Sequence, residues 1–251
     1  MGTKTVNRHR FRQLCLLLAA GITSTLVIRC ASRKYISSDD FVLPILFKAF
    51  ENPTRVTIGN ESNYGPSLSP NGAYMFYTSD RTGNKDLFVK KTRGGYAVPL
   101  TSHPADDFSP VMSPDGSMLA FVSRRTNAAG SIHVMKIGQS ISKLSGQIEG
   151  DTFSINLPDL ELRNPAWYPK GHKIVFSGRG LGERIPRIYT AKVAESPDII
   201  PLDGIRGDYP TVSHAGGMIA YSRSGALFLF QPGQKKEIKL TTGETVQDGH
   251  P

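Results

Sequence analysis

The fold is decided by a nine-residue stretch that occurs four times in this chain. The copies are Tyr64-Gly-Pro-Ser-Leu-Ser-Pro-Asn-Gly72, Phe108-Ser-Pro-Val-Met-Ser-Pro-Asp-Gly116, Arg163-Asn-Pro-Ala-Trp-Tyr-Pro-Lys-Gly171 and Asp208-Tyr-Pro-Thr-Val-Ser-His-Ala-Gly216. Their first prolines, at positions 66, 110, 165 and 210, lie 44, 55 and 45 residues apart. A period of this length indicates a repeat protein, in which each copy is one unit that packs against its neighbours.

Each copy predicts a short strand, a tight turn and a second strand, because proline presets φ and glycine supplies the positive φ that the turn needs. After the turn glycine of the second copy, Leu119, Ala120 and Phe121 are all apolar, so this strand must be covered on both faces. A third strand follows in every copy, and a fourth ends at Thr101 in the first copy and Thr241 in the last. His133 occupies a column that is aromatic in the other copies, which predicts a packing role.

Four strands in each 40 to 45 residues are typical of propeller blades, whose sheets need a neighbour on each face. We therefore predict an all-β fold, a partial β-propeller of four four-stranded blades at about 64–101, 108–162, 163–202 and 208–241. A two-sheet sandwich would not require the same turn motif in every unit. The longer second unit contains an extra stretch from Gln139 to Leu162, interpreted as a loop or an elaborated outer strand.

Three segments divide the chain: 1–30, 31–53 and 54–251. Residues 1–12 are basic and residues 14–28 are apolar or small, the pattern of a secretory signal peptide or an N-terminal signal/anchor helix. Residues 31–53 are a connector, and 54–251 form the propeller segment. Cys30 stands where a lipoprotein signal places its lipid-bearing cysteine, although Arg29 argues against recognition by the signal peptidase. Ordinary cleavage nearby and an uncleaved membrane anchor stay open.

The net charge of +9 is not a nucleic-acid signal. Five of the 30 basic residues lie in the first 29 positions, which hold no acid, so the remainder carries 25 basic against 21 acidic residues. No basic stripe with interleaved aromatic residues appears in the body, and we expect no nucleic-acid binding. Both cysteines, Cys15 and Cys30, lie in the N-terminal segment, which leaves the body without a disulfide or a thiol ligand set.

The repeat resembles that of TolB-like propellers. The residues that carry this resemblance are Ser113-Pro114-Asp115-Gly116 followed by Leu119-Ala120-Phe121-Val122-Ser123, and Ser79-Asp80-Arg81-Thr82-Gly83 in the first copy. Lys170 and His214-Ala215 depart from the Pro-Asx pattern in the last two copies. The resemblance implies a six-bladed propeller of the bacterial periplasm that binds envelope proteins, including a peptidoglycan-associated lipoprotein. This chain is shorter, and Pro251 falls where a next blade would begin, so we expect a truncated frame or a fragment.

The predicted function is a non-catalytic, exported scaffold for protein–protein binding in the cell envelope, with no cofactor and with membrane contact through the N-terminal anchor or lipid. Asp106, Asp107 and Asp208 precede blades and are candidates for a partner-binding rim, the alternative being solvated loop carboxylates. Propellers of this type also precede the catalytic domain of prolyl-oligopeptidase-like serine peptidases, but no G-x-S-x-G elbow is present. A propeller-type polysaccharide-binding or lyase protein would need metal-binding histidines. The body's histidines lack paired ligand spacing: His103, His133, His172, His214 and His250.

Overall fold

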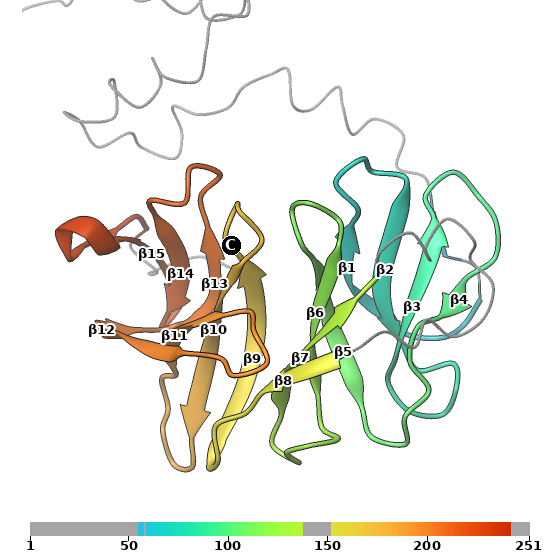
Figure 1. Cartoon of the computed structure of the whole chain (residues 1–251), viewed down its shortest axis with the longest axis horizontal. Coiled ribbons are helices and arrows are strands. Elements are labelled where there is room, and N and C mark those ends of the chain that lie inside the picture. The colour runs from blue at the N-terminus through green and yellow to red at the C-terminus, as the bar shows by residue number, and fades with distance from the viewer. Residues whose placement is uncertain (1–54, 58, 138–151, 242–251) are drawn as a thin grey trace, which may run out of the picture. The chain divides into compact units, whose positions relative to one another are not determined.

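Four antiparallel sheets of four strands each make up the part of the chain that the computed structural model describes, residues 55–57, 59–137 and 152–241. Each sheet uses four strands that are consecutive in the sequence, and we call these sheets blades 1 to 4 (Figure 1). The prediction of an all-β fold with four four-stranded blades in a propeller arrangement is confirmed.

The strand bounds follow from chain order within each blade. Blade 1 contains β1 (Asn63–Leu68), β2 (Tyr74–Ser79), β3 (Asp86–Lys91) and β4 (Val98–Pro99). Blade 2 contains β5 (Asp107–Met112), β6 (Met118–Ser123), β7 (Ser131–Lys136) and β8 (Thr152–Ile155). Blade 3 contains β9 (Leu160–Trp167), β10 (Lys173–Gly180), β11 (Arg187–Lys192) and β12 (Ile199–Arg206). Blade 4 contains β13 (Asp208–Val212), β14 (Ile219–Arg223), β15 (Ala226–Gln231) and β16 (Lys236–Lys239), with a 3-10 turn η2 (Pro232–Gln234) before β16.

The repeated turn joins the first two strands of every blade. Its glycine has a positive φ of 67 to 75° in all four copies and donates its N–H to the carbonyl three residues earlier, as Gly116 does to Ser113 at 2.9 Å. The departures in the last two copies leave this geometry intact, because Gly171 and Gly216 still make the bond, at 2.9 and 2.7 Å. The turn therefore forms around the left-handed glycine even in the copies that lack an Asx residue before it.

One aromatic pair recurs across the second and third strands of the blades, with ring centroids 5.7 to 6.1 Å apart. The pairs are Tyr77–Phe88, Phe121–His133, Phe176–Tyr189 and Tyr221–Phe228. His133 thus packs on Phe121 as predicted, and its Nε2 lies 3.1 Å from the hydroxyls of Thr126 and Ser131. Burial lowers the His133 pKa to about 4, with the Arg125 charge adding to the effect, so the ring is neutral at pH 7.

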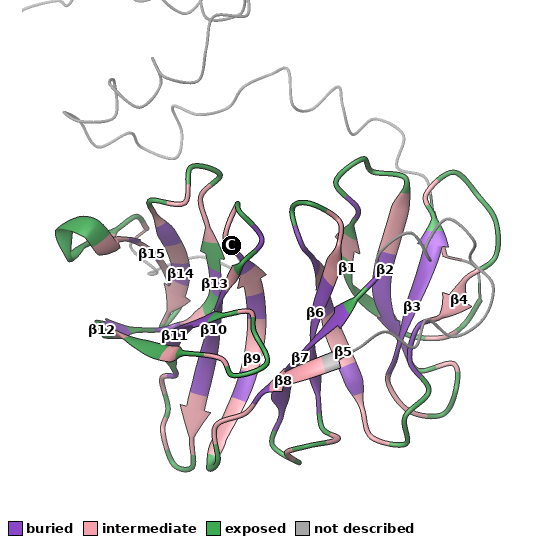
Figure 2. Cartoon of the chain, viewed as in Figure 1, coloured by how far each residue is buried: buried purple, intermediate pink, exposed green. Residues whose placement is uncertain are grey.

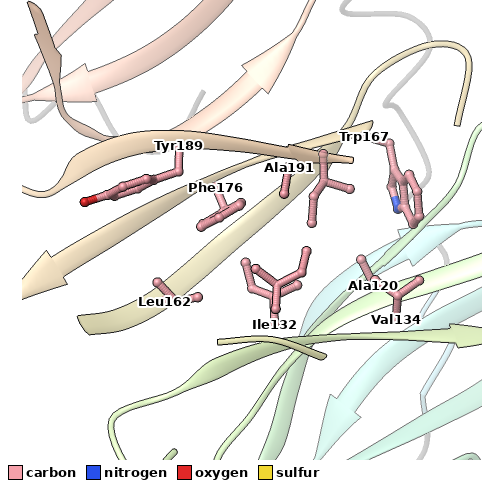
Figure 3. Packing of buried hydrophobic residues seen from close by; sticks show 10 residues of the cluster. Ala120, Ile132, Val134, Leu162, Trp167, Phe176, Tyr189 and Ala191 are labelled. Carbon is pink, nitrogen blue, oxygen red and sulfur yellow. The ribbon is translucent and has the colours of Figure 1, made fainter. Parts of the chain in front are cut away.

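Three apolar clusters hold the blades together, one in each space between neighbouring sheets. The middle cluster joins blades 2 and 3, where Ala120, Ile132 and Val134 face Leu162, Trp167 and Phe176 (Figure 3). Phe121 and Phe176 are fully buried. The second and third strands of blades 1 to 3 are mostly buried, whereas the connecting loops are exposed (Figure 2). This confirms that the sheets bury one another's apolar faces, the premise of the sequence interpretation.

The second and third blades differ from their expected limits. β8 is the outer strand of blade 2, so part of the stretch 139–162 is an elaborated outer strand. β9 begins at Leu160 instead of 163, where the Asn127 side-chain amide donates to the Leu160 carbonyl and the Leu162 N–H donates to the Gly130 carbonyl. β12 runs to Arg206 and not to 202. Hydrogen bonds to the loop 124–130 lie along the start of β9, whereas β12 continues because Arg206 still pairs with Arg187 of β11. The repeated turn motif carries no information about either contact.

The predicted signal or anchor helix, the connector, Cys30 and residues 139–151 lie outside the described residues. Within the residues that the structure describes, no helix has the length and apolar character to cross a membrane.

Candidate partner-binding rim

The innermost strands of the blades, β1, β5, β9 and β13, run side by side in the same direction, because equivalent repeat positions meet at each junction. Hydrogen bonds join them at matching heights: the Met112 N–H donates to Ser67 Oγ at 3.0 Å, and Trp167 Nε1 donates to the Val111 carbonyl at 2.8 Å. Their starting residues therefore lie at one end of the propeller. We call this end the start rim; it also contains the loops 80–85, 124–130, 181–186 and 224–225. The end that carries the repeated turns is the turn rim.

Each innermost strand bulges at the first proline of its repeat, where its pairing with the second strand shifts. The residue before this proline is left-handed in every blade: Gly65, Ser109, Asn164 and Tyr209, at φ 60, 55, 52 and 51°. Glycine and asparagine tolerate this conformation, whereas a bulky aromatic residue adopts it at a cost. The position two before the proline is held by Tyr64, Phe108, Arg163 and Asp208, and these side chains distinguish one junction from the next.

Between blades 1 and 2, this position is aromatic. Lys85 Nζ lies 5.8 Å from the ring centroid of Tyr64 and 5.3 Å from that of Phe108. Asp106 lies beside them, with its carboxylate 3.2 Å from Arg124 Nη1 and accepting the Lys85 backbone N–H at 3.2 Å. Asp106 lies on the start rim, partly exposed and ion-paired with Arg124; its role in partner binding stays a prediction.

Asp107 points the other way, into blade 2. Its side chain is 0% exposed and its carboxylate accepts a hydrogen bond from Arg125 Nη2. Burial raises the Asp107 pKa, against the opposing effect of hydrogen bonds from Ser123 and of Arg125. Asp107 is neither solvated nor presented at the surface, so direct partner contact stays a prediction for Asp106 and Asp208 alone.

Between blades 3 and 4, the same position is charged. Arg163 Nη2 lies 2.5 Å from Asp208 Oδ2, while Asn164 Nδ2 donates to Asp208 Oδ1 at 2.7 Å. Asp208 therefore fastens two neighbouring innermost strands. Asp208 was a candidate from the sequence, but its partner Arg163, which lies 45 residues earlier, was not.

A groove of about 660 Å³ opens on the start rim at this junction. Tyr209 and the apolar Ile185 and Pro186 line it, together with three arginines and one aspartate: Arg163, Arg184, Arg223 and Asp208. Arg223 is engaged by both oxygens of Glu237, at 2.8 and 3.0 Å. Arg184 is exposed and, among the described residues, its side chain has no ion pair. None of the three arginines was predicted from the sequence. Arg163 could have been found, because it occupies the repeat position that is aromatic in the first two copies.

The turn rim carries a groove of similar size, about 670 Å³, beside Lys91 and Arg93 of blade 1. Over the residues that the structure describes, no three histidine, cysteine, aspartate or glutamate side chains gather as metal ligands would. His103 lies in the segment before β5, where its Nδ1 accepts the Ala105 N–H, and His172 and His214 lie in turns.

The chain shares sequence and fold with characterised and uncharacterised proteins. A family model described as the TolB beta propeller domain matches residues 45–230. Among curated proteins, "Uncharacterized protein Atu1656" of Agrobacterium fabrum is 24% identical over 49% of this chain and 42% of its own length. "Uncharacterized peptidase YuxL" of Bacillus subtilis is 27% identical over 48% of this chain and 18% of its own. The chain thus spans less than half the length of these relatives.

Solved structures agree on the fold. TolB from Acinetobacter baumannii superimposes with a TM-score of 0.59 at 19% identity, covering 76% of this chain and 46% of that one. A putative TolB from Agrobacterium tumefaciens gives 0.55 at 19% identity, with 74% and 64% covered. A chain of the nidogen/laminin complex gives 0.54 at 17% identity, with 74% and 66% covered. With the family model matching about three quarters of its length, this chain belongs to the TolB beta propeller domain family.

Proposed function

We propose that this protein is a non-catalytic binding scaffold of the bacterial cell envelope, and that it holds a partner protein on its start rim. The observation that carries the proposal is the groove between blades 3 and 4, which combines cationic and apolar side chains on a rigid frame. Rigid sheets that present variable side chains at one end are a common way to build a recognition surface.

The comparisons support a binding role by analogy. Two structural neighbours are TolB proteins, and a third is a chain from a complex of nidogen and laminin. The family resemblance implies a periplasmic location and envelope partners, with a peptidoglycan-associated lipoprotein as one. Membrane attachment through the segment 1–30, with or without a lipid on Cys30, belongs to the same proposal.

A second candidate is the propeller of a larger peptidase, favoured by the match to YuxL. The match covers 18% of that protein, which leaves room there for a separate catalytic domain. In such a protein the propeller would accompany catalysis without supplying the reacting groups. The two candidates differ in what the start rim contacts: a separate envelope protein, or a domain of the same polypeptide.

Site-specific photo-crosslinking in bacterial cells tests the first candidate. A photo-reactive amino acid replaces Ser224 at the start rim in one variant and Arg93 at the turn rim in another. We expect an envelope protein to be captured from position 224 and not from position 93, and mass spectrometry identifies it. Equal capture from both ends, or none from position 224, contradicts the proposal. Hydrolysis of peptide substrates by the purified 251-residue chain would contradict the non-catalytic assignment.

A further inference from the structure

We infer that the groove between blades 3 and 4 recognises an acidic side chain, followed by an apolar residue, in an extended segment of the partner. The inference names the partner chemistry of the start rim and rests on the proposed function. Three features carry it: the surplus of arginines, the exposed and unengaged Arg184, and the unusual backbone of Tyr209.

The charges of the groove do not cancel among its lining residues, which are three arginines against one aspartate. Two of these cations already hold carboxylates, Arg163 that of Asp208 and Arg223 that of Glu237. The Arg223–Glu237 pair uses both guanidinium nitrogens and both carboxylate oxygens, the geometry that an arginine fork matches best. Arg184 supplies a third guanidinium, and within the described part of the chain no carboxylate pairs with it.

The neighbouring acid does not neutralise Arg184. Glu183 Oε2 accepts the backbone N–H of Gly180 at 3.2 Å, and its Oε1 lies 3.2 Å from Arg187 and 3.4 Å from Arg206. Both carboxylate oxygens are therefore occupied by other donors. The exposed guanidinium of Arg184 is therefore available to pair with an incoming anion.

Tyr209 gives the groove its apolar side. The equivalent left-handed position holds glycine, serine or asparagine in the other blades, so blade 4 alone among them accepts an aromatic residue there, at φ 51°. Strained residues of this kind persist where the surrounding structure enforces them, and they are frequent at binding sites. Tyr209 lines the groove together with Ile185 and Pro186, and these residues offer apolar surface to a side chain next to the anion.

The size of the groove fits a short peptide. Its volume of about 660 Å³ falls within the usual range of ligand sites, roughly 300 to 1,000 Å³. Residues from two neighbouring blades line it, so an extended segment lying along the junction would contact both.

Fluorescence anisotropy of a labelled, terminally blocked pentapeptide, Ser-Glu-Phe-Glu-Ser, tests the inference on the full chain. The matched probe is Ser-Gln-Phe-Gln-Ser, which keeps the shape and removes the charge. We expect the acidic peptide to bind at least tenfold more tightly than the neutral one, and its affinity to fall with added sodium chloride.

Four variants sharpen the test: two should weaken binding of the acidic peptide, one should strengthen it and one should leave it nearly unchanged. Arg184→Gln weakens binding of the acidic peptide about tenfold, whereas Arg93→Gln, the same change in the turn-rim groove, leaves it within about twofold. Tyr209→Asn, which installs the residue of blade 3, weakens binding about threefold to fivefold. Asp208→Asn removes the anion that holds Arg163 and strengthens binding several-fold. Circular dichroism and thermal melts verify that each variant is folded.

Wild-type affinity in Arg184→Gln, or equal losses in Arg184→Gln and Arg93→Gln, overturns the inference. Displacement of the peptide by millimolar inorganic phosphate also overturns it, because the groove would then recognise phosphate. These failures are separable from failure of the proposed function: capture of an envelope protein from position 224 that does not depend on Arg184 leaves the scaffold role standing.

Discussion

The junction between blades 1 and 2 and the junction between blades 3 and 4 place different chemistry on the same backbone positions. In the first, Tyr64 and Phe108 flank the Lys85 ammonium. In the second, Arg163 and Asp208 form an ion pair beside a groove. Beneath both lies an apolar cluster of the same design. The buried apolar clusters hold neighbouring blades together at both junctions, whereas the side chains at the start rim differ from one junction to the other.

The largest loss of unfolding free energy is expected from substitutions in the apolar clusters, which the two junctions share. Phe121→Ala empties the cluster under the first junction and Ile219→Ala the cluster under the second, both from fully buried positions. Phe121→Ala should lower the free energy of unfolding by about 3 to 5 kcal/mol, and Ile219→Ala by about 2 to 4 kcal/mol. In both variants the substitution leaves a cavity that the sheets cannot close. Urea denaturation followed by circular dichroism measures both values.

The exposed Leu181→Ala serves as the control for these core variants and should stay within about 0.5 kcal/mol of wild type. A loss below about 1 kcal/mol at either buried position would mean that the blades do not depend on mutual burial at that junction.

The second effect is a loss of stability at low pH, which we expect from the blade 2 side of the first junction and not from blade 4. His133 packs on Phe121 of the first junction, whereas Phe228 fills the equivalent position in blade 4. The folded His133 pKa of about 4 lies below the unfolded value of about 6.5, so only the unfolded chain gains the proton between these values. Stability present above pH 6.5 is therefore lost as the pH falls toward 4, by roughly 3 kcal/mol.

His133→Phe should abolish this loss. Asp107 works in the opposite direction, since burial raises its pKa, but it is present in both proteins and cancels in the difference. Unfolding free energies at pH 7.5, 6, 5 and 4 give the comparison. Parallel pH profiles for the two proteins would show that His133 does not titrate as its burial requires.

The third effect concerns the ion pair of the second junction. Arg163→Gln and Asp208→Asn should each cost about 1 to 2 kcal/mol of unfolding free energy, because the pair is largely shielded and Asp208 also accepts from Asn164. A double-mutant cycle should yield a coupling of about 1 kcal/mol. If the two losses of unfolding free energy were strictly additive, the ion pair would not stabilise the junction between blades 3 and 4.

The smallest effect belongs to the first junction. Lys85→Gln removes the ammonium between Tyr64 and Phe108 and should cost about 0.5 to 1 kcal/mol. Thermal melts at low and high salt detect it. If Lys85→Gln lowered the unfolding free energy more than Arg163→Gln does, the polar contacts of the first junction would contribute more stability than the ion pair of the second, contrary to expectation.

Much of the fold could be predicted from the sequence, since the turn glycines and the apolar residues after them recur with the period of the blades. The packing role of His133 followed from the same alignment of copies. The start rim could not be predicted in this way, because Arg163 and Asp208 meet only when neighbouring strands lie side by side. Asp107 shows the limit of inference from a loop-like position: it is adjacent to the partly exposed Asp106, yet the alternation of a strand turns it inward. Arg184 lies in a loop outside the repeat, where periodicity carries no information.

The most direct test of the account is a titration of isotope-labelled protein with the blocked acidic pentapeptide, followed by backbone amide chemical shifts. We expect the largest shifts at the amides of Gly207, Ser222 and Ser224, which line the groove between blades 3 and 4. Shifts confined to Gly72, Gly94 and Gly95 on the turn rim, or none at saturating peptide, would contradict it.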